Sequence, residues 1–311
     1  MNHMKKDISI INIYLKLVFV AFFWGASAIA GKIALQYSTP AMVIFLRFFI
    51  ATIIMVPVLL LKKESVNIEL RSHIKSAIIS LAGVSFCYYL YFNGLNLSSA
   101  FNAGVIEATT PLVTILFTFL LNMERINSYQ ISGLILAYLG VLITITKGNW
   151  NILFTSDYNT GDILLLLSTF CFGAYNILTK RWQINIPPNV FMFYFFLYGC
   201  LTLSPWLIYT GWGSFYNELN KMINPVPFLA EVFMALCGSV MAYLFFNEGI
   251  ARIGVSKTSS FINLVPLITA FLSVYFLGEL ANVYQWGGAA IILSGIFLSN
   301  KLVVKQASEH S

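Results

Sequence analysis

Residues 100–121 read AFNAGVIEATTPLVTILFTFLL, and Glu107 is the one charged residue in this stretch. About 20 consecutive apolar residues are enough for a helix to cross the hydrocarbon core of a membrane. The chain contains nine further runs of this kind, separated by short turn-type sequences. The ten runs cover approximately residues 14–35, 41–61, 74–95, 101–121, 129–146, 162–181, 190–209, 226–250, 257–276 and 284–302. We therefore predict an all-α integral membrane protein with ten transmembrane helices.

The composition excludes a soluble fold. Of the 311 residues, 59% are hydrophobic and 10% are charged, whereas soluble domains average about 25% charged residues. The apolar runs are continuous, and this argues against the alternating pattern of a transmembrane β-barrel. The basic residues are dispersed, which argues against a nucleic-acid partner. The four cysteines and three histidines lack metal-ligand spacing, so we expect neither a metal nor a cofactor.

Lysine and arginine indicate the orientation. With a cytoplasmic N-terminus, the inner loops and helix ends hold Lys5, Lys6, Lys16, Lys62, Lys63, Arg71, Lys75, Arg125, Lys180, Arg181, Arg252, Lys257, Lys301 and Lys305. The outer side holds Lys147 and Lys221. Under the positive-inside rule, this 14-to-2 split predicts that both termini are cytoplasmic, in a bacterial inner membrane. The first apolar run exceeds the length of a signal peptide, and we expect it to be an uncleaved helix.

The two halves of the chain resemble each other at two fixed offsets. An offset of 148 aligns Gly25 with Gly173, Lys32 with Lys180, Pro40 with Pro188 and Pro57 with Pro205. An offset of 155 aligns Gly83 with Gly238, Tyr88 with Tyr243, Gly94 with Gly249, Pro111 with Pro266, Glu124 with Glu279, Gly133 with Gly288 and Gly140 with Gly295. Because a five-helix unit has an odd number of spans, its second copy enters the membrane from the opposite side.

The predicted organisation is therefore a pair of inverted five-helix repeats. The first repeat covers residues 1–146 and the second covers residues 162–302, joined by an outer linker at 147–161 and followed by a cytoplasmic tail at 303–311. Two halves that exchange conformations can give an inward-open and an outward-open state of one fold.

Several motifs of the chain resemble those of the drug/metabolite transporter superfamily, and more closely the EamA-type ten-helix permeases. They are Trp24-Gly25, Arg47-Phe48, Pro111, Pro266, Asn122-Met123-Glu124-Arg125, Leu277-Gly278-Glu279-Leu280, and the glycine pairs Gly133/Gly140 and Gly288/Gly295. The match extends over nearly the whole chain. The resemblance implies a solute carrier, commonly an exporter of amino acids or related metabolites, without implying one substrate.

Three charged residues lie deeper than the helix ends, namely Arg47, Glu107 and Glu231. A charge at membrane depth costs about 2.5 kcal/mol or more, so each is expected to face protein or water. Arg47 and Glu107 are each about six residues from the outer end of their predicted helices, so both are expected to lie roughly 9 Å below the outer face. Glu107 is either a protonatable or solute-facing carboxylate, or a structural partner of Arg47 or Lys32. Glu231 is expected to be solvated near the outer boundary.

A polar face and several aromatic residues are candidates for the solute pathway. Glu107, Thr110, Thr114 and Thr118 recur on one face of the fourth helix, beside Pro111. The full set of pathway candidates is Trp24, Ser27, Tyr88, Tyr91, Glu107, Thr110, Thr114, Tyr175, Asn176, Tyr243, Asn247, Asn263 and Thr269. These side chains can equally serve helix packing, since hydroxyls bond their own backbone and aromatic rings fill membrane cores.

The function predicted from these features is secondary active transport of a small, amino-acid-like organic solute, with proton coupling as a candidate energy source. The chain has no nucleotide-binding P-loop motif and no signature of an intramembrane hydrolase, so we expect it not to be an enzyme. The alternatives are a non-transporting membrane assembly subunit and an efflux permease for drugs or toxic compounds.

Overall fold

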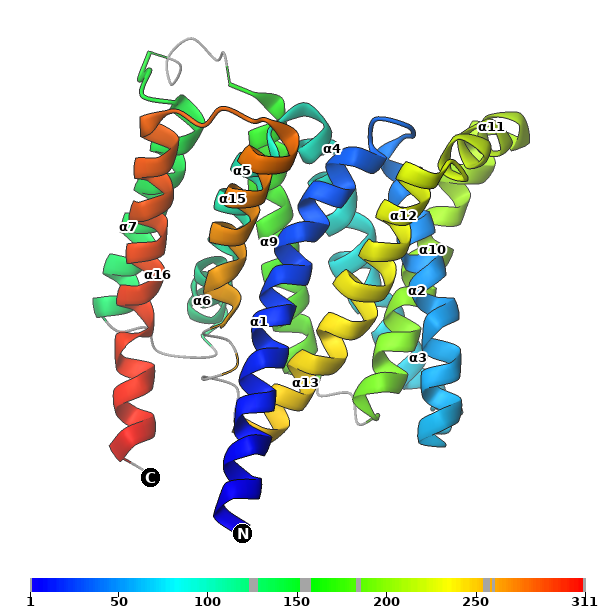
Figure 1. Ribbon diagram of the computed structural model, residues 1–311, viewed down its shortest axis with the longest axis horizontal. Helices are drawn as coiled ribbons and strands as arrows, with labels where there is room; N and C mark the ends of the chain where they lie inside the picture. The colour runs from blue at the N-terminus through cyan, green and yellow to red at the C-terminus, as the bar shows by residue number, and fades with distance from the viewer. Residues whose placement is uncertain are drawn as a thin grey trace. The chain divides into compact units, whose positions relative to one another are not determined.

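The computed structural model describes residues 2–122, 128–151, 158–182, 186–253, 258 and 261–309. These residues form helices and connecting turns without strands, which confirms the all-α prediction for this part of the chain (Figure 1). The helices are α1 (Asn2–Ala34), α2 (Pro40–Lys62), α3 (Leu70–Ser80), η1 (Leu81–Phe86), α4 (Cys87–Leu97), α5 (Ala100–Glu107), α6 (Thr110–Leu120), α7 (Ser128–Thr146), α9 (Thr160–Trp182), α10 (Pro188–Thr210), α11 (Trp212–Met222), α12 (Pro225–Phe233), η2 (Met234–Met241), α13 (Ala242–Ile253), η3 (Phe261–Leu264), α15 (Val265–Leu277) and α16 (Val283–Glu309).

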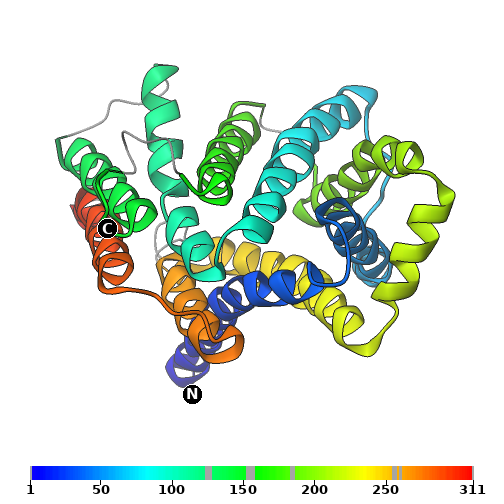
Figure 2. The same cartoon turned by 90° about the horizontal axis from the view of Figure 1, so that it is seen from above.

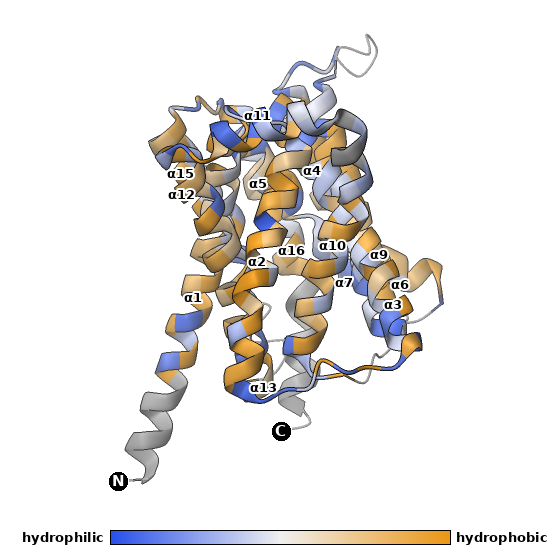
Figure 3. Cartoon of the chain, turned by 90° about the vertical axis from the view of Figure 1, so that its right-hand side faces the viewer, coloured by the Kyte–Doolittle hydropathy of each residue, from blue (hydrophilic) through white to orange (hydrophobic). Residues whose placement is uncertain are grey.

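Seven helical stretches among the described residues are long and apolar enough to cross a membrane. They are Ile11–Ala34, Pro40–Lys62, Leu70–Leu97, Ala100–Leu120, Ser128–Thr146, Thr160–Trp182 and Pro225–Ile253. Two shorter apolar helices cover Phe261–Leu277 and Val283–Leu298, and α10 occupies the predicted seventh run. Apolar residues dominate most of these helices in Figure 3. The chain is thus a multi-pass membrane protein, while the count of ten spans stays a prediction.

Pro111 interrupts the fourth predicted helix. The run at 101–121 is divided into α5, which ends at Glu107, and α6, which begins at Thr110. Proline lacks the backbone N–H that the helical ladder requires, and it is tolerated in the first turn of a helix. The fourth predicted helix is therefore interrupted near mid-span. Pro266 likewise lies at the start of α15, directly after the short 3₁₀ helix η3.

The third and eighth predicted helices each contain a π-helical segment that the sequence pattern does not reveal. These segments are η1, between α3 and α4, and η2, between α12 and α13. The 155-residue offset aligns η1 with residues 236–241 of η2, and each segment contains the aligned glycine, Gly83 or Gly238. π-Helical turns are rare and often occur at functional sites. Their occurrence at aligned positions therefore singles out these two helices.

Two boundaries differ from the sequence-based prediction. Helix α11 follows α10 in a stretch that was expected to be a loop. Helix α16 continues to Glu309, so the residues expected to form a tail from 303 onward are helical as far as that residue. The Glu124 turn and Lys257 lie outside the described residues.

The helices are grouped into two compact units that interleave along the sequence. Unit 1 comprises Met1–Ala77 and Asn185–Ile268, and unit 2 comprises Ile78–Ile184 and Thr269–Ser311. In unit 1, α1 packs along α12, η2 and α13, and α2 packs along α10. Figure 2 shows α12 and α13 (yellow) following the course of α1 (blue). Each unit therefore combines segments from both halves of the chain.

In unit 2, α7 pairs with α16, and α9 packs against α4, α5 and α6. Figure 1 shows α7 and α16 running side by side. Glycine allows this close approach: a Cβ added to Gly140 would lie 2.7 Å from the carbonyl oxygen of Gly288, and one on Gly295 would lie 2.6 Å from that of Gly133. Small residues at helix crossings are typical of membrane proteins. The paired glycine motifs therefore have a direct structural role.

Candidate functional site

The candidate pathway residues are divided between the two units. Unit 1 holds Trp24, Ser27, Arg47, Tyr243, Asn247 and Asn263, and unit 2 holds Tyr88, Tyr91, Glu107, Thr110, Thr114, Tyr175, Asn176 and Thr269. A pairing of Glu107 with Arg47, one of the alternatives left open by the sequence, would join residues of different units and stays a prediction. The contacts described below lie within one unit.

A buried polar cluster in unit 1 surrounds Arg47. We call it the Arg47 cluster, and its members are Trp24, Ser27, Arg47, Glu231, Gly238 and Ser239. Arg47 lies in α2 and is 4% exposed. Its Nε donates a hydrogen bond of 3.1 Å to Oγ of Ser239 in η2. A buried guanidinium requires such partners, because desolvation of a charge is otherwise unfavourable.

Gly238 of η2 is the point where α1 contacts this cluster. Trp24 donates from its indole Nε1 to the carbonyl oxygen of Gly238 at 3.0 Å. The Trp24 ring also packs against Tyr243 and Phe246, with centroid separations of 5.7 and 5.4 Å. A Cβ on Gly238 would overlap the hydroxyl of Ser27, which donates to its own helix. The structure thus brings together three of the predicted candidates, Trp24, Ser27 and Tyr243.

The prediction that Glu231 is solvated is wrong. Its side chain is 1% exposed and lies inside unit 1. Because α12 begins at Pro225, Glu231 is almost two turns into the helix, on the side covered by its neighbours. Arg47 interacts electrostatically with its carboxylate. Distance from the helix start suggested solvation, whereas burial depends on the face that packs against α1 and α2.

In unit 2, Glu107 lies at the end of α5 and is half-buried. The hydroxyl of the buried residue Ser168, in α9, lies 3.1 Å from Oε1 of Glu107. The backbone carbonyl of Ser168 accepts a hydrogen bond from Cys87 Sγ at 3.6 Å. Glu107 is therefore linked to α9 and lies next to the break between α5 and α6.

Two further candidates of unit 2 meet directly. Asn176 of α9 donates from Nδ2 to Oγ1 of Thr114 in α6, at 3.1 Å. Thr114 in turn donates to the carbonyl of Thr110 one turn earlier. Thr114, on the threonine face of the fourth predicted helix, is thus directed toward α9. Both Asn176 and Thr114 are half-buried.

The remaining candidates of unit 2 are mainly in packing contacts. Tyr88 lies 6.2 Å from Tyr91 between ring centroids, and Tyr175, which is buried, lies 5.0 Å from Phe172. Thr269 is also buried, and a Cβ on Gly104 would lie 2.7 Å from its Cβ. Of the other candidates in unit 1, Asn247 and Asn263 are half-buried in α13 and η3.

A second polar network in unit 2 was missed by the sequence analysis. Asp162, which is fully buried in α9, accepts hydrogen bonds from the Ser98 hydroxyl and from Asn102 Nδ2, the latter at 3.0 and 3.1 Å. Gln285 Nε2 donates to Oδ1 of Asn102 at 2.7 Å. The carboxylate of Asp162, the charged group of this network, is thus matched by hydrogen-bond donors, as a structural network requires. A single acidic residue in the first turn of α9 was the available signal.

Glu279 completes this region by capping a helix. Its Oε1 and Oε2 accept from the backbone amides of Ala100 and Phe101, at 2.8 and 2.9 Å, at the start of α5. A carboxylate in this position satisfies free amides and complements the helix dipole. Gly278 has a φ of 64° and ends α15, which directs Glu279 to this place. The Gly278-Glu279 turn of the motif therefore has a structural explanation.

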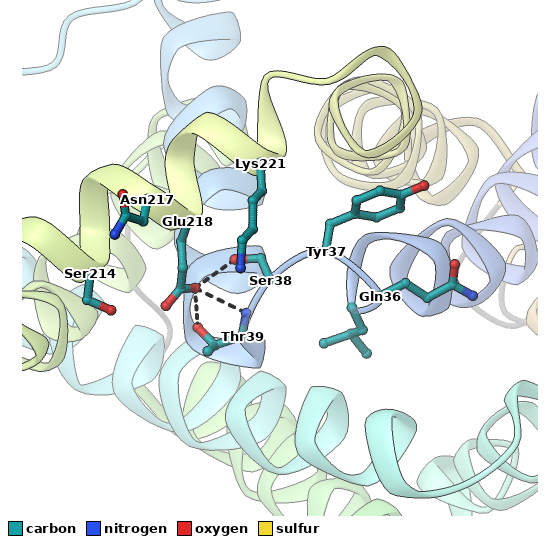
Figure 4. Close-up of a pocket in the computed structure, with 9 residues that line it drawn as sticks. Gln36, Tyr37, Ser38, Thr39, Ser214, Asn217, Glu218 and Lys221 are labelled. Carbon is teal, nitrogen blue, oxygen red and sulfur yellow. Dashed lines mark hydrogen bonds between the residues drawn. The ribbon is translucent and has the colours of Figure 1, made fainter.

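An open pocket of about 470 Å³ lies where α11 meets the start of α2 in unit 1 (Figure 4). Glu218 accepts from Ser38 Oγ at 2.7 Å, Thr39 Oγ1 at 2.6 Å and the Thr39 amide at 3.1 Å. Partial burial acts to raise the pKa of Glu218, but these donors and the charge of Lys221 outweigh it, so the pKa lies below its ordinary value. The contact anchors α11 to the N-terminus of α2.

The membrane-spanning helices and their buried polar clusters define a multi-pass helical membrane protein. The chain belongs to the EamA-like transporter family, whose family model matches residues 11–146 and again residues 159–301. The resemblance inferred from the motifs is therefore confirmed.

Relatives of full length carry transporter names. "Uncharacterized transporter YyaM" of Bacillus subtilis (strain 168) is 28% identical over 295 residues, covering 94% of this chain and 95% of the relative. An "Uncharacterized transporter" of Archaeoglobus fulgidus is 24% identical over 286 residues, covering 92% and 96%. A solved crystal structure with 16% sequence identity superposes with a TM-score of 0.62 over 94% of this chain and 98% of the other, which shows a shared fold.

Proposed function

We propose that this membrane transporter exports amino acids or related small organic metabolites by alternating access of two inverted five-helix repeats, residues 1–146 and 162–302. Family membership supports transport itself, and the repeats supply the means of alternation. Both termini are proposed to face the cytoplasm of a bacterial cell, on the basis of the distribution of basic residues.

One observation carries this proposal: the same helix contact occurs in both units. A Cβ added to Gly249 of α13 would lie 2.9 Å from Cδ2 of Leu17 in α1. A Cβ added to Gly94 of α4 would lie 2.8 Å from Cγ of Leu165 in α9. The 155-residue offset aligns Gly94 with Gly249, and the 148-residue offset aligns Leu17 with Leu165. This correspondence supports duplicated units that can exchange conformations.

The pairing of whole helices follows the same rule. The contact of α1 with α13 in unit 1 corresponds to the contact of α9 with α4 in unit 2. The pairs α2–α10 and α7–α16 join segments that the offset of 148 or 155 aligns with each other. This pattern is expected of a pseudo-twofold arrangement of inverted repeats.

The side chains around the candidate pathway favour an organic solute. They combine aromatic rings with neutral hydroxyl and amide groups, such as Trp24, Thr114 and Asn176. Aromatic rings with a polar edge suit amphipathic organic molecules, whereas routes for inorganic ions usually use clustered carboxylates or carbonyls. Glu107 is proposed as the carboxylate that faces the ammonium group of an amino-acid-like solute.

Reconstitution tests this function. The full chain in liposomes is offered labelled amino acids, a labelled nucleotide-sugar, a labelled simple cation and a labelled hydrophobic drug, with protein-free liposomes as the control. Flux of the amino acids is the expected result. Flux of the cation or the nucleotide-sugar alone would contradict the solute class, flux of hydrophobic drugs alone would favour an efflux permease, and no flux of any compound would favour an assembly subunit.

A further inference from the structure

Two buried carboxylates of this protein, those of Asp162 and Glu231, differ in their hydrogen bonding. Asp162 receives hydrogen bonds from Ser98 and Asn102, and is therefore fully compensated. In the described part of the chain, neither oxygen of Glu231 has a hydrogen-bond partner, although its side chain is 1% exposed. Burial of a carboxylate without donors is unfavourable enough that such groups are seldom retained for stability alone.

The charge that faces Glu231 is that of Arg47. Arg47 lies in α2, and α2 packs against α12, the helix that carries Glu231. The two side chains interact electrostatically across the interior of unit 1. The Nε of Arg47 is held by Ser239, so the guanidinium is fixed to η2. Opposite charges in a medium of low dielectric constant attract each other strongly even without a direct hydrogen bond.

The elements that pack against α12 carry several other charged groups. Helix α11 carries Glu218 and Lys221, which belong to the pocket at the start of α2. Helix α1 carries Lys16, which pairs with Glu248 at 2.6 Å, and Lys32 near its end. The charge of Arg47 acts on the Glu231 carboxylate. Arg47 and Glu231 can therefore be treated as one electrostatically coupled pair.

The duplicated fold does not require this pair. The offset of 155 aligns Glu231 with Ser76, and the offset of 148 aligns Arg47 with Phe195. Both aligned residues are neutral and buried. Each repeat carries one of the two charges and has a neutral residue at the position aligned with the other charge. Each of the two helix positions is therefore compatible with a neutral residue, so packing of the fold alone accounts for neither charge.

A π-helical segment begins three residues after Glu231, at Met234. Such segments interrupt the regular helical ladder and allow a local change in helix register. Protonation would convert the Glu231 carboxylate into a neutral carboxylic acid and remove its attraction to Arg47. The contact between α12 and α2 would then weaken directly beside the segment that can rearrange.

We propose that Glu231 is a proton-binding site that couples transport to the proton gradient, with Arg47 as its counter-charge. One proton adds to a carboxylate oxygen of Glu231 from one side of the membrane and leaves from the other side, and no bond other than O–H forms or breaks. This inference rests on the proposed transport function. It assigns the coupling role to Glu231 and leaves Glu107 as the solute-facing carboxylate.

Infrared difference spectroscopy tests proton binding without any solute. The purified full chain in lipid is exposed to lowered pH, and the carbonyl stretch of protonated carboxylic acid is recorded. Glu231→Gln should abolish the pH-dependent band of the buried acid. Glu248→Gln is the matched control, because this half-buried residue of the same unit is paired with Lys16 and should leave that band unchanged. A band that survives in Glu231→Gln would overturn the proposal.

A second variant covers the case in which Glu231→Gln does not fold. Glu231→Asp keeps a titratable group but moves it by one methylene relative to Arg47, so the midpoint of the band should shift while the band persists. An unchanged midpoint in folded Glu231→Asp would also overturn the proposal.

Transport of labelled amino acids separates this inference from the proposed function. In proteoliposomes, Glu231→Gln should keep exchange at equal pH and lose stimulation by an imposed pH gradient. Gradient-stimulated transport by the folded Gln variant would reject the coupling role while leaving the transport function intact. A titrating band in a protein that moves no amino acid would support the proton site and reject the proposed solute class.

Discussion

Gly249 of α13 lies against Leu17 of α1 so closely that a Cβ on the glycine would come within 2.9 Å of the leucine side chain. Its aligned residue, Gly94, meets Leu165 in the same way, but here the backbone oxygen of Gly161 and the backbone nitrogen of Leu165 are equally near, at 2.8 and 2.9 Å. Side-chain ends can move aside, whereas the backbone of a packed helix cannot do so without displacing the helix.

The first prediction follows from this difference. Gly94→Ala should destabilise the protein by about 1–3 kcal/mol, because overpacking forces two helices apart. Gly249→Ala should be milder, because Leu17 and Thr258 contribute side-chain atoms to its contact. Thermal unfolding in detergent measures both. Gly213→Ala is the control, since no atom lies within 4 Å of its added Cβ, and a Tm for Gly94→Ala equal to that of the control would contradict the close contact.

The second prediction concerns Gly238 and Ser27 in the Arg47 cluster. Gly238→Ala should lower Tm and transport activity because its Cβ overlaps the Ser27 hydroxyl. Ser27→Ala removes that hydroxyl and loses a hydrogen bond to its own helix, a loss of about 1 kcal/mol. The double variant should therefore be more stable than Gly238→Ala alone. A double-mutant cycle with purely additive effects would rule out this contact.

Apolar periodicity predicted where the helices lie, since each of the ten runs overlaps a helix. It could not predict η1 and η2, because a π-helical turn depends on how the neighbouring helices fit rather than on hydrophobic spacing. The interruption at Pro111 differs from η1 and η2, because the missing N–H is a property of proline itself and is visible in the sequence. The structure divides the helix there into α5 and α6.

The polar residues were harder to assign from sequence than the helices. Trp24, Ser27 and Tyr243 were predicted as candidates, and they lie in or against the Arg47 cluster. Glu231 was assigned to solvent because its distance from a helix end gives depth but not the face on which it lies. Asp162 was overlooked for a related reason. Its partners Ser98 and Asn102 lie about 60 residues earlier in the chain, just before and at the start of α5, and they meet Asp162 only when α5 packs against α9.

Glu218 supplies a third prediction, on pH dependence. Its folded-state pKa lies below the ordinary value, so its hydrogen bonds contribute stability above the unfolded-state pKa, and this contribution is lost as pH falls through the folded-state pKa. Glu218→Gln should therefore lower Tm at neutral pH and differ less from the unmodified protein in acid. Asn217→Ala, a change in the same pocket, is the control. A Tm difference that grows in acid would contradict this account.

A fourth prediction fixes the orientation. Because 14 basic residues lie on one predicted side and Lys147 and Lys221 on the other, both termini should be cytoplasmic. Alkaline phosphatase fused after Ser311 should be inactive, while a green fluorescent protein fused there should fluoresce. A truncation fused after Lys221 should give active phosphatase. Active phosphatase after Ser311 would reverse the topology and the direction assigned to transport.

The last prediction separates the roles of two carboxylates. Glu107→Gln retains an oxygen for the Ser168 hydroxyl but removes the charge. If Glu107 faces the ammonium group of the solute, the KM for a labelled amino acid should rise roughly tenfold, equivalent to about 1.4 kcal/mol. The dependence on a pH gradient should stay, because we assign that role to Glu231.

Two other outcomes for Glu107→Gln carry distinct meanings. If Glu107 is instead the structural partner of a buried cation, its loss should cost about 3–5 kcal/mol and appear as reduced Tm with an unchanged KM in the folded fraction. If gradient-driven flux disappears while exchange persists, proton coupling belongs to Glu107. Glu248→Gln, measured in parallel, controls for the removal of one negative charge from the protein, because that carboxylate is paired with Lys16 away from both sites.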